Sequence, residues 1–325
     1  MRKYSTLTKV AVGVGSALAW MAGDANADAL AQSDINVLNF LLTKGGATFT
    51  PFNVTDFSQL NILDSLNNTA VLNPGGSDFK TASIAGFGGA DASQASVGAN
   101  PHGQNVFAAD NTPPTATFAR SDSLLTGAAI SGTPFPLGES ASTVAETSII
   151  GNANGNSTGN ILDTTSFTFV LAHGISDAGV TFNATTFLQA WTAAGSLPGT
   201  LAGASINWEL KIVDGITNAP LIDWIPDGTT TGGTQLGLTS LSEGCTLVSN
   251  TSATFNQPAP ITTCSGHFAA LSTVSLAGGH PYVFTINQTV QSHATEVVPE
   301  PASLALLGVA LAGMGFASRR RRPTG

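Results

Sequence analysis

The chain has 325 residues and a formal net charge of −9, but its charged residues are unevenly distributed. Seven of the 11 Lys and Arg residues lie near the two ends. Residues 28–297 contain 18 Asp and Glu but only four Lys and Arg, which gives this region a net charge of −14. The four cations are Lys44, Lys80, Arg120 and Lys211. Binding of naked nucleic acid requires clustered Lys and Arg, so this composition excludes nucleic acid as a partner.

Residues 1–27 have the three parts of an export signal in the usual order. Basic residues at positions 2, 3 and 9 precede an apolar run over residues 10–22, and Ala25 and Ala27 supply the small residues of a cleavage site. We expect a short signal helix that takes the chain to the Sec translocon and is removed after Ala27, with Ala31 as the second choice. The mature protein then works outside the cytoplasm.

Residues 28–150 are predicted to form a β-rich, loop-rich exported region. Its first part, residues 28–44, is interpreted as a short helix that ends at Gly45 and Gly46. Residues 151–160 are rich in Gly, Asn and Ser, which predicts a low-complexity linker or loop. The sequence fits either one β-rich unit or two sandwiches joined at this segment.

Residues 161–297 show the clearest strand periodicity. Apolar and polar residues alternate over residues 205–212, as is typical of a half-buried strand. Asp214 and Gly215 then form a hairpin signal, and residues 221–225 supply the returning strand. Because such strands recur between Gly, Pro and Asn turns, we expect an all-β fold. The favoured architecture is an antiparallel β-sandwich of jelly-roll or immunoglobulin-like type.

Cys245 and Cys264 are the two cysteines of the chain, and both lie in the exported region. A disulfide is the expected state of such a pair in an oxidising compartment. Closing this loop should stabilise the fold by roughly 3 kcal/mol in the chain-entropy model.

Catalytic motifs do not rise above chance in the exported region, so we expect a protein that is not an enzyme. The segment 138–142 resembles a nucleophile elbow but ends in Ser142 instead of glycine. The five histidines lack the spacing of metal ligands. A secreted hydrolase is accordingly the least favoured class.

Two weaker signals concern ligands. Asp214, Asp223 and Asp227 are candidate oxygen ligands for Ca²⁺, although turn-forming aspartates account for them equally well. Trp191 and Trp224 are candidate aromatic platforms for a glycan, whereas a packing role is the commoner one for tryptophan. A carbohydrate-binding module is therefore the alternative function.

The C-terminal tail, residues 298–325, contains three unlike elements in order. Pro299, Glu300 and Pro301 precede an uncharged run over residues 302–317, and a basic cluster follows at Arg319, Arg320, Arg321 and Arg322. The apolar run is long enough for a thin transmembrane helix, and the arginines would remain in the cytoplasm. The prolines would keep the segment before the helix extended.

These elements resemble the PEP-CTERM sorting signal over about residues 298–322. The resemblance implies recognition of Pro299, Glu300 and Pro301 by exosortase, a membrane-embedded cysteine protease, after transient anchoring in the inner membrane. It also implies a Gram-negative host that produces exopolysaccharide. We therefore expect a structural or adhesive protein of the cell surface or biofilm matrix, with Ca²⁺ bridging its acidic surface to exopolysaccharide.

Overall fold

The computed structural model describes residues 28–108, 115–151, 153–196, 198–230, 234–257 and 261–296, together with residue 310. The expected signal helix with Ala25 and Ala27 and the sorting residues Pro299, Glu300 and Pro301 lie outside these residues. So does the expected transmembrane helix with its arginines, apart from residue 310. Within the described ranges, no helix has the length and apolar character needed to cross a membrane.

Two antiparallel sheets account for the regular structure of the described residues, which confirms the expected all-β class. Sheet I has the strand order β15-β17-β11-β1-β9-β8-β6, with β2 paired to β1 and β7 paired to β8. Its strands are β1 (Asp28–Lys44), β2 (Thr50–Pro51), β6 (Ala90–Asp91), β7 (Ala95–Gly98), β8 (Phe118–Thr126), β9 (Glu139–Ile150), β11 (Gly179–Thr192), β15 (Leu238–Glu243) and β17 (Ile261–Ser272).

Sheet II has the strand order β14-β13-β12-β18-β10-β4-β5, with β16 paired to β12 and β3 paired to β10. Its strands are β3 (Phe57–Asn61), β4 (Leu63–Asn73), β5 (Gly76–Ala85), β10 (Asn154–Leu171), β12 (Leu201–Asp214), β13 (Pro220–Ile225), β14 (Thr234–Leu236), β16 (Ser249–Thr254) and β18 (Pro281–Thr295). Two 3-10 turns, η1 (Gly46–Thr48) and η2 (Val54–Asp56), flank β2.

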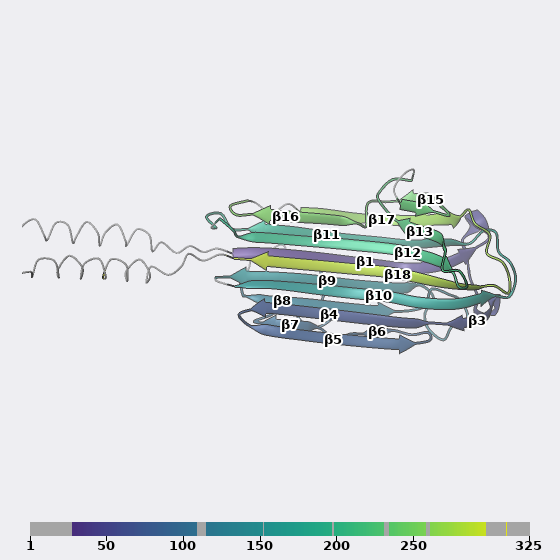
Figure 1. Cartoon of the computed structure of the whole chain (residues 1–325), viewed down its shortest axis with the longest axis horizontal. Helices are drawn as coiled ribbons and strands as arrows, with labels where there is room; N and C mark the ends of the chain where they lie inside the picture. The colour runs from purple at the N-terminus through teal and green to yellow at the C-terminus, as the bar shows by residue number, and fades with distance from the viewer. Residues whose placement is uncertain are drawn as a thin grey trace, which may run out of the picture.

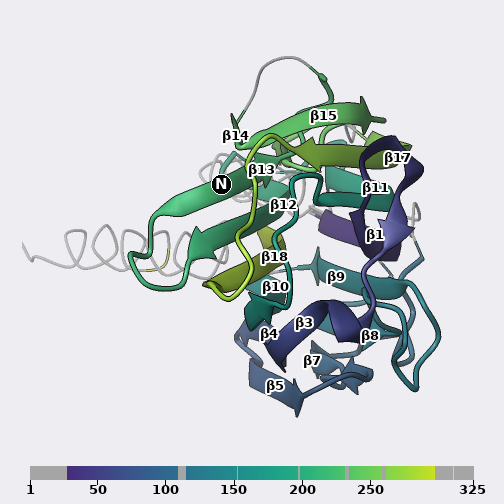
Figure 2. The same cartoon turned by 90° about the vertical axis from the view of Figure 1, so that its right-hand side faces the viewer.

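The two sheets pack face to face, and their strands run along the long axis of the molecule (Figure 1). A view along this axis shows the two layers and places β5 at one margin of sheet II (Figure 2). β1 begins and β18 ends at the same end of the sandwich, which we call the base; the opposite end is the distal end (Figure 1). Both terminal segments of the chain therefore leave from the base.

Residues 28–44 form strand β1, so the expected helix is wrong. β1 lies in the middle of sheet I and pairs with β9 on one side and β11 on the other. Ala31 and Ile35 face the interior, and Gln32 and Asp34 on the opposite face are also buried. Because both faces are covered, the strand lacks the apolar–polar alternation of a half-exposed strand.

The segment predicted as a linker or loop at residues 151–160 becomes part of β10 from Asn154 onward. β10 pairs with β4 from the first half of the chain and with β18 from the second half. In sheet I, β1 lies between β9 and β11 in the same way. Each sheet therefore combines strands from both halves of the sequence.

The predicted hairpin after residue 205 is confirmed as β12 and β13. The alternating apolar residues of β12 all point inward and are buried: Ile206, Trp208, Leu210 and Ile212. The predicted disulfide is also confirmed, since Cys245 and Cys264 are joined with a Cα–Cα distance of 5.9 Å. It ties the segment after β15 to β17.

The interior differs between the two ends of the sandwich. Towards the distal end the core is aromatic, and the rings of Phe182 and Phe268 stack with centroids 4.9 Å apart. At the base the core consists almost entirely of alanine: Ala29, Ala31, Ala70, Ala95, Ala119, Ala153, Ala190, Ala202, Ala253 and Ala294, with Leu72 and Ile149.

Short hydroxyl side chains connect the two sheets directly in the part of the sandwich nearer the base. Ser33 Oγ on β1 donates to the carbonyl of Gln291 on β18 over 2.8 Å. Thr147 Oγ1 and Ser292 Oγ form a second cross-sheet hydrogen bond of 2.8 Å. These contacts require the two backbones to lie close together.

Candidate functional site

Trp224 is fully buried, so the structure overturns its prediction as a glycan platform. Its indole Nε1 donates to Glu243 Oε1 over 2.8 Å, which satisfies the polar group inside the core. Trp191 on β11 is only half-buried. Of the two predicted platforms, Trp191 alone keeps part of its surface exposed to solvent.

Asp214, Asp223 and Asp227 are each bound in a different local interaction. Asp214 accepts hydrogen bonds from two backbone amides of its turn and from His280, and these contacts hold its carboxyl pKa well below the usual range. Asp223 lies 3.6 Å from Lys211 Nζ, and Asp227 accepts from Thr229. Within the described ranges, no three His, Cys, Asp or Glu residues are grouped to hold a metal ion. The three aspartates therefore do not form one Ca²⁺ site.

Every cation of the described sandwich is paired with a carboxylate. The salt bridges are Lys44–Asp56, Lys80–Asp78, Arg120–Glu146 and Lys211 with Glu209 and Asp223. Carboxylates far outnumber these four cations, so the sandwich carries a net negative charge.

A buried charged cluster lies on the outer face of sheet I, beneath the segment 99–108. Arg120 is fully buried, and its Nε donates to Glu146 Oε2 over 2.8 Å. His102 Nε2 lies 3.5 Å from the same carboxylate oxygen. Arg120 Nη1 also donates to the Val106 carbonyl over 3.0 Å, so the cluster fastens the covering segment to the sheet.

Asp34 lies on the same face of β1 and is nearly inaccessible, with 3% of its surface exposed. Burial raises the pKa of its carboxyl to about 8, although the charge of Arg120 and a hydrogen bond from Asn36 act in the opposite direction. A buried carboxylate is costly to ionise, so Asp34 holds a proton at neutral pH. This cluster can store a proton and anchor a loop.

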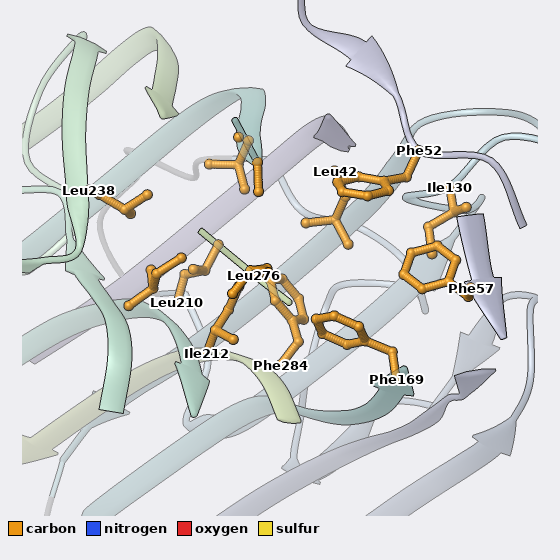
Figure 3. Close-up of a pocket in the computed structure, with 14 residues that line it drawn as sticks. Leu42, Phe52, Phe57, Ile130, Phe169, Leu210, Ile212, Leu238, Leu276 and Phe284 are labelled. Carbon is orange, nitrogen blue, oxygen red and sulfur yellow. The ribbon is translucent and has the colours of Figure 1, made fainter. Parts of the chain in front are cut away.

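A small apolar cavity lies between the sheets towards the distal end (Figure 3). Its volume is about 40 Å³, and its walls include Leu42, Phe52, Phe57, Ile130, Phe169, Leu210, Ile212, Leu238, Leu276 and Phe284. Pockets for drug-sized molecules measure about 300 to 1,000 Å³, so this cavity is a packing defect and no substrate site. The apolar side chains drawn around it offer no partner for a water molecule.

The first and last residues of the sandwich, Asp28 and Glu296, both lie at the base. The Asp28 carbonyl accepts from the amide of Ala193 over 2.9 Å, and the Glu296 amide donates to the Ala153 carbonyl over 3.0 Å. Burial and the nearby charge of Asp28 raise the pKa of Glu296 to about 7. The first and last residues of the sandwich are thus fixed in the fold next to the point where the tail leaves.

Comparison with known proteins identifies this tail. No curated protein matches the chain. The structure of infectious bursal disease virus Gx strain has 9% sequence identity over 90% of this chain and 89% of that chain, but its TM-score of 0.09 carries no argument about fold. Residues 297–322 match the family model of the PEP-CTERM protein-sorting motif, which confirms the resemblance seen in the sequence. The chain therefore carries a PEP-CTERM sorting motif that begins directly after Glu296, at the base of the sandwich.

Proposed function

We propose that the mature chain is a structural, adhesive component of the cell surface or of an exopolysaccharide matrix. The sorting motif implies an exported protein whose tail is anchored in the membrane until exosortase cleaves it. The observation that carries the proposal is the position of this motif, which follows the last strand of the sandwich directly. Sorting therefore acts on the sandwich as a whole.

The tether between the sandwich and the expected anchor is short. Five residues, 297–301, separate Glu296 from the apolar run that begins at residue 302. Even fully extended, five residues span at most about 18 Å. We infer that the base lies close to the membrane before cleavage and that cleavage frees the whole sandwich from it.

The acidic surface supports association with a matrix through divalent cations. Paired cations leave an excess of carboxylates, which repel acidic polysaccharides. Ca²⁺ prefers oxygen ligands and can bridge two such surfaces without a preformed protein site. On this proposal, matrix binding depends on Ca²⁺.

Processing is tested in the native host with the full-length chain. The triple substitution Pro299→Ala, Glu300→Ala, Pro301→Ala should keep the protein in the membrane fraction with its tail. Pro323→Ala, outside the matched motif, is the control and should be processed normally. Intact-mass measurement reports the C-terminus, and surface material that retains the four arginines in the unmodified protein would contradict the sorting route.

Matrix association is tested by co-sedimentation of the released protein with host exopolysaccharide. Binding should be strong with Ca²⁺ and lost with EDTA, while NaCl at constant Ca²⁺ should leave it largely intact. Equal binding in Ca²⁺ and EDTA would reject cation bridging. The same assay with Trp191→Ala addresses the carbohydrate-binding alternative, which predicts loss of binding in that variant even with Ca²⁺ present.

A further inference from the structure

We propose that strand β5 is a self-pairing edge through which two copies of this chain form an antiparallel dimer, with the two-fold axis at Phe79. The two copies then share one continuous sheet II. The pairing itself follows from the sandwich alone; its timing rests on the proposed function.

β5 is the terminal strand of sheet II and pairs with one neighbour, β4 (Figures 1 and 2). It runs for ten residues without a proline, whereas the other terminal strands, β14, β15 and β6, have three, six and two residues. An edge strand of this length presents a row of backbone donors and acceptors to another chain. β5 is therefore the most extensive edge that the described sandwich offers.

The alternation of hydrogen bonds between β4 and β5 shows which residues of β5 direct their backbone groups away from the sheet. The Gly86 amide donates to the Ile62 carbonyl over 2.9 Å, in the register that continues through the β4–β5 pair. Hydrogen-bonded pairs alternate along an antiparallel ladder, so even-numbered residues of β5 bond to β4. Odd-numbered residues such as Phe79 and Thr81 direct their N–H and C=O groups away from the sheet. In agreement, the Phe79 amide donates to the Asp78 carboxylate over 2.9 Å.

Charge selects one register for the pairing of two β5 strands. With the axis at Phe79, Ser77 faces Thr81 and Asp78 of each copy faces Lys80 of the other. Within each copy Asp78 already lies 3.3 Å from its own Lys80 and accepts from the Ser96 amide, so pairing brings together two such ion pairs with opposite charges facing each other. These opposite charges occupy positions that are not hydrogen-bonded, where the strands lie closest, about 4.5 Å between Cα atoms. The neighbouring registers place Asp78 against Asp78 or Lys80 against Lys80, and like charges directly opposite each other are unfavourable.

Phe79 adds an apolar contact to the same register. Its side chain is 62% exposed in the single sandwich, which makes it one of the most exposed large apolar residues described. The two-fold axis places the two Phe79 rings directly opposite each other on the outer face of the joined sheet. Aromatic pairs across adjacent strands stabilise a sheet.

The direction of the pairing links it to sorting. β5 runs along the long axis, so antiparallel pairing turns the bases of the two copies in opposite directions (Figure 1). Two copies that stand on one membrane by their bases cannot adopt this arrangement. Pairing therefore requires copies freed by tail removal, or copies on facing surfaces.

The first experiment uses processed protein released by the native host, analysed by sedimentation velocity over a range of concentrations. The unmodified protein should show a concentration-dependent dimer. Thr81→Pro removes an outward N–H and leaves the β4 ladder intact, so it should raise the dimer dissociation constant about tenfold or more while melting normally. Thr81→Val keeps the N–H and should dimerise like the unmodified protein. A monomer at all concentrations, or a dimer unaffected by Thr81→Pro, would overturn the proposal even if processing is normal.

A second experiment tests the register through single cysteines. Both native cysteines are joined in a disulfide, so an added cysteine is the single free thiol. Across the proposed axis the two Phe79 Cα atoms lie about 5.5 Å apart, within the range for a disulfide. Phe79→Cys should therefore form a covalent dimer under mild oxidation. Thr81→Cys should not, since the two Thr81 positions are offset along the strands. Cross-linking at residue 81 and not at residue 79 would overturn the register.

Discussion

The base and the distal end hold the same two sheets together by different means. At the base, alanine side chains fill the interior and hydroxyl groups form hydrogen bonds from sheet to sheet. Towards the distal end, Phe and Trp rings fill the interior and leave a cavity of about 40 Å³. Small side chains allow close backbones and direct hydrogen bonds, whereas large ones stabilise through buried apolar area.

This difference indicates how each end responds to substitution. The interior at the base has no room for a larger side chain, and Gly155 on β10 illustrates this: an added Cβ would lie 2.7 Å from Leu72 Cδ2 and 2.9 Å from Thr147 Cγ2. The distal end already contains unfilled volume. We therefore expect the distal end to suffer most from lost atoms and the base to suffer most from added ones.

The largest effect is expected from Trp208→Ala in the distal core. Trp208 is 1% exposed, and its ring lies 4.9 Å from that of Phe182 and 5.9 Å from that of Trp224. Its removal should lower the free energy of unfolding by about 3 to 5 kcal/mol in urea denaturation. Phe255→Ala, at a side chain 45% exposed, is the control and should change it by less than about 0.5 kcal/mol. If Trp208→Ala lowers the free energy of unfolding only slightly, buried aromatic rings do not account for the stability of the distal end.

Two carboxyl groups with raised pKa values, Asp34 and Glu296, should make stability depend on pH, and Asp34 should contribute most because its pKa is raised further. Its pKa is about 8 in the folded chain and about 3.8 when unfolded, so the folded state binds the proton more strongly between these values. The contribution of Asp34 to stability should therefore fall as the pH rises from about 4 to 8, by at most about 1.4 kcal/mol per pH unit. Asp34→Asn should reduce the overall slope in urea titrations at pH 5, 6 and 7 and leave the part due to Glu296. Identical slopes would assign the dependence to other groups.

A matched pair of enlargements tests the available space directly. Ala294→Val at the base should cost about 1 to 3 kcal/mol because the site is fully packed. Ala178→Val adds the same two methyl groups beside the distal cavity and should be neutral or stabilising by up to about 1 kcal/mol. Thermal melting compares the two variants. Equal losses would show that the ends do not differ in packing.

The smallest effect is expected from a single cross-sheet hydrogen bond. Ser33→Ala removes the donor to the Gln291 carbonyl and should cost about 1 kcal/mol. Ser58→Ala removes an exposed hydrogen bond to Val170 and should cost less. Chemical denaturation at one pH measures the free energy of unfolding of both variants. Equal decreases would show that the cross-sheet hydrogen bond stabilises the base no more than an exposed one.

The parts of the fold that alternate in sequence could be predicted, and the parts built from small residues could not. β12 has one buried face, so its pattern is visible. β1 is buried on both faces and therefore resembles other apolar segments. The beginning of β10 contains Gly155, where an added Cβ would lie 2.7 Å from Leu72 Cδ2 and 2.9 Å from Thr147 Cγ2. Small residues that suggest a loop in the sequence are required here by close packing.

Functional residues could likewise be predicted only where their chemistry lies in consecutive residues of the sequence. The sorting tail was predictable because its chemistry lies in consecutive residues. Trp224 and the three aspartates could not be placed, since burial and local partners depend on the folded sandwich. The Arg120–Glu146–His102 cluster was missed because its members come from separate segments without a common spacing.

The position of β18 has a mechanical consequence. While the tail is anchored, any drag on the sandwich reaches it through the C-terminal end of β18, along the direction of that strand. β18 is bonded on both edges, to β10 and to β12, over most of its length. A pull along the strand loads these two ladders in shear, so that many hydrogen bonds share the force instead of opening one by one. Until the tail is cleaved, the sandwich is therefore held through a strand that is hydrogen-bonded along both of its edges.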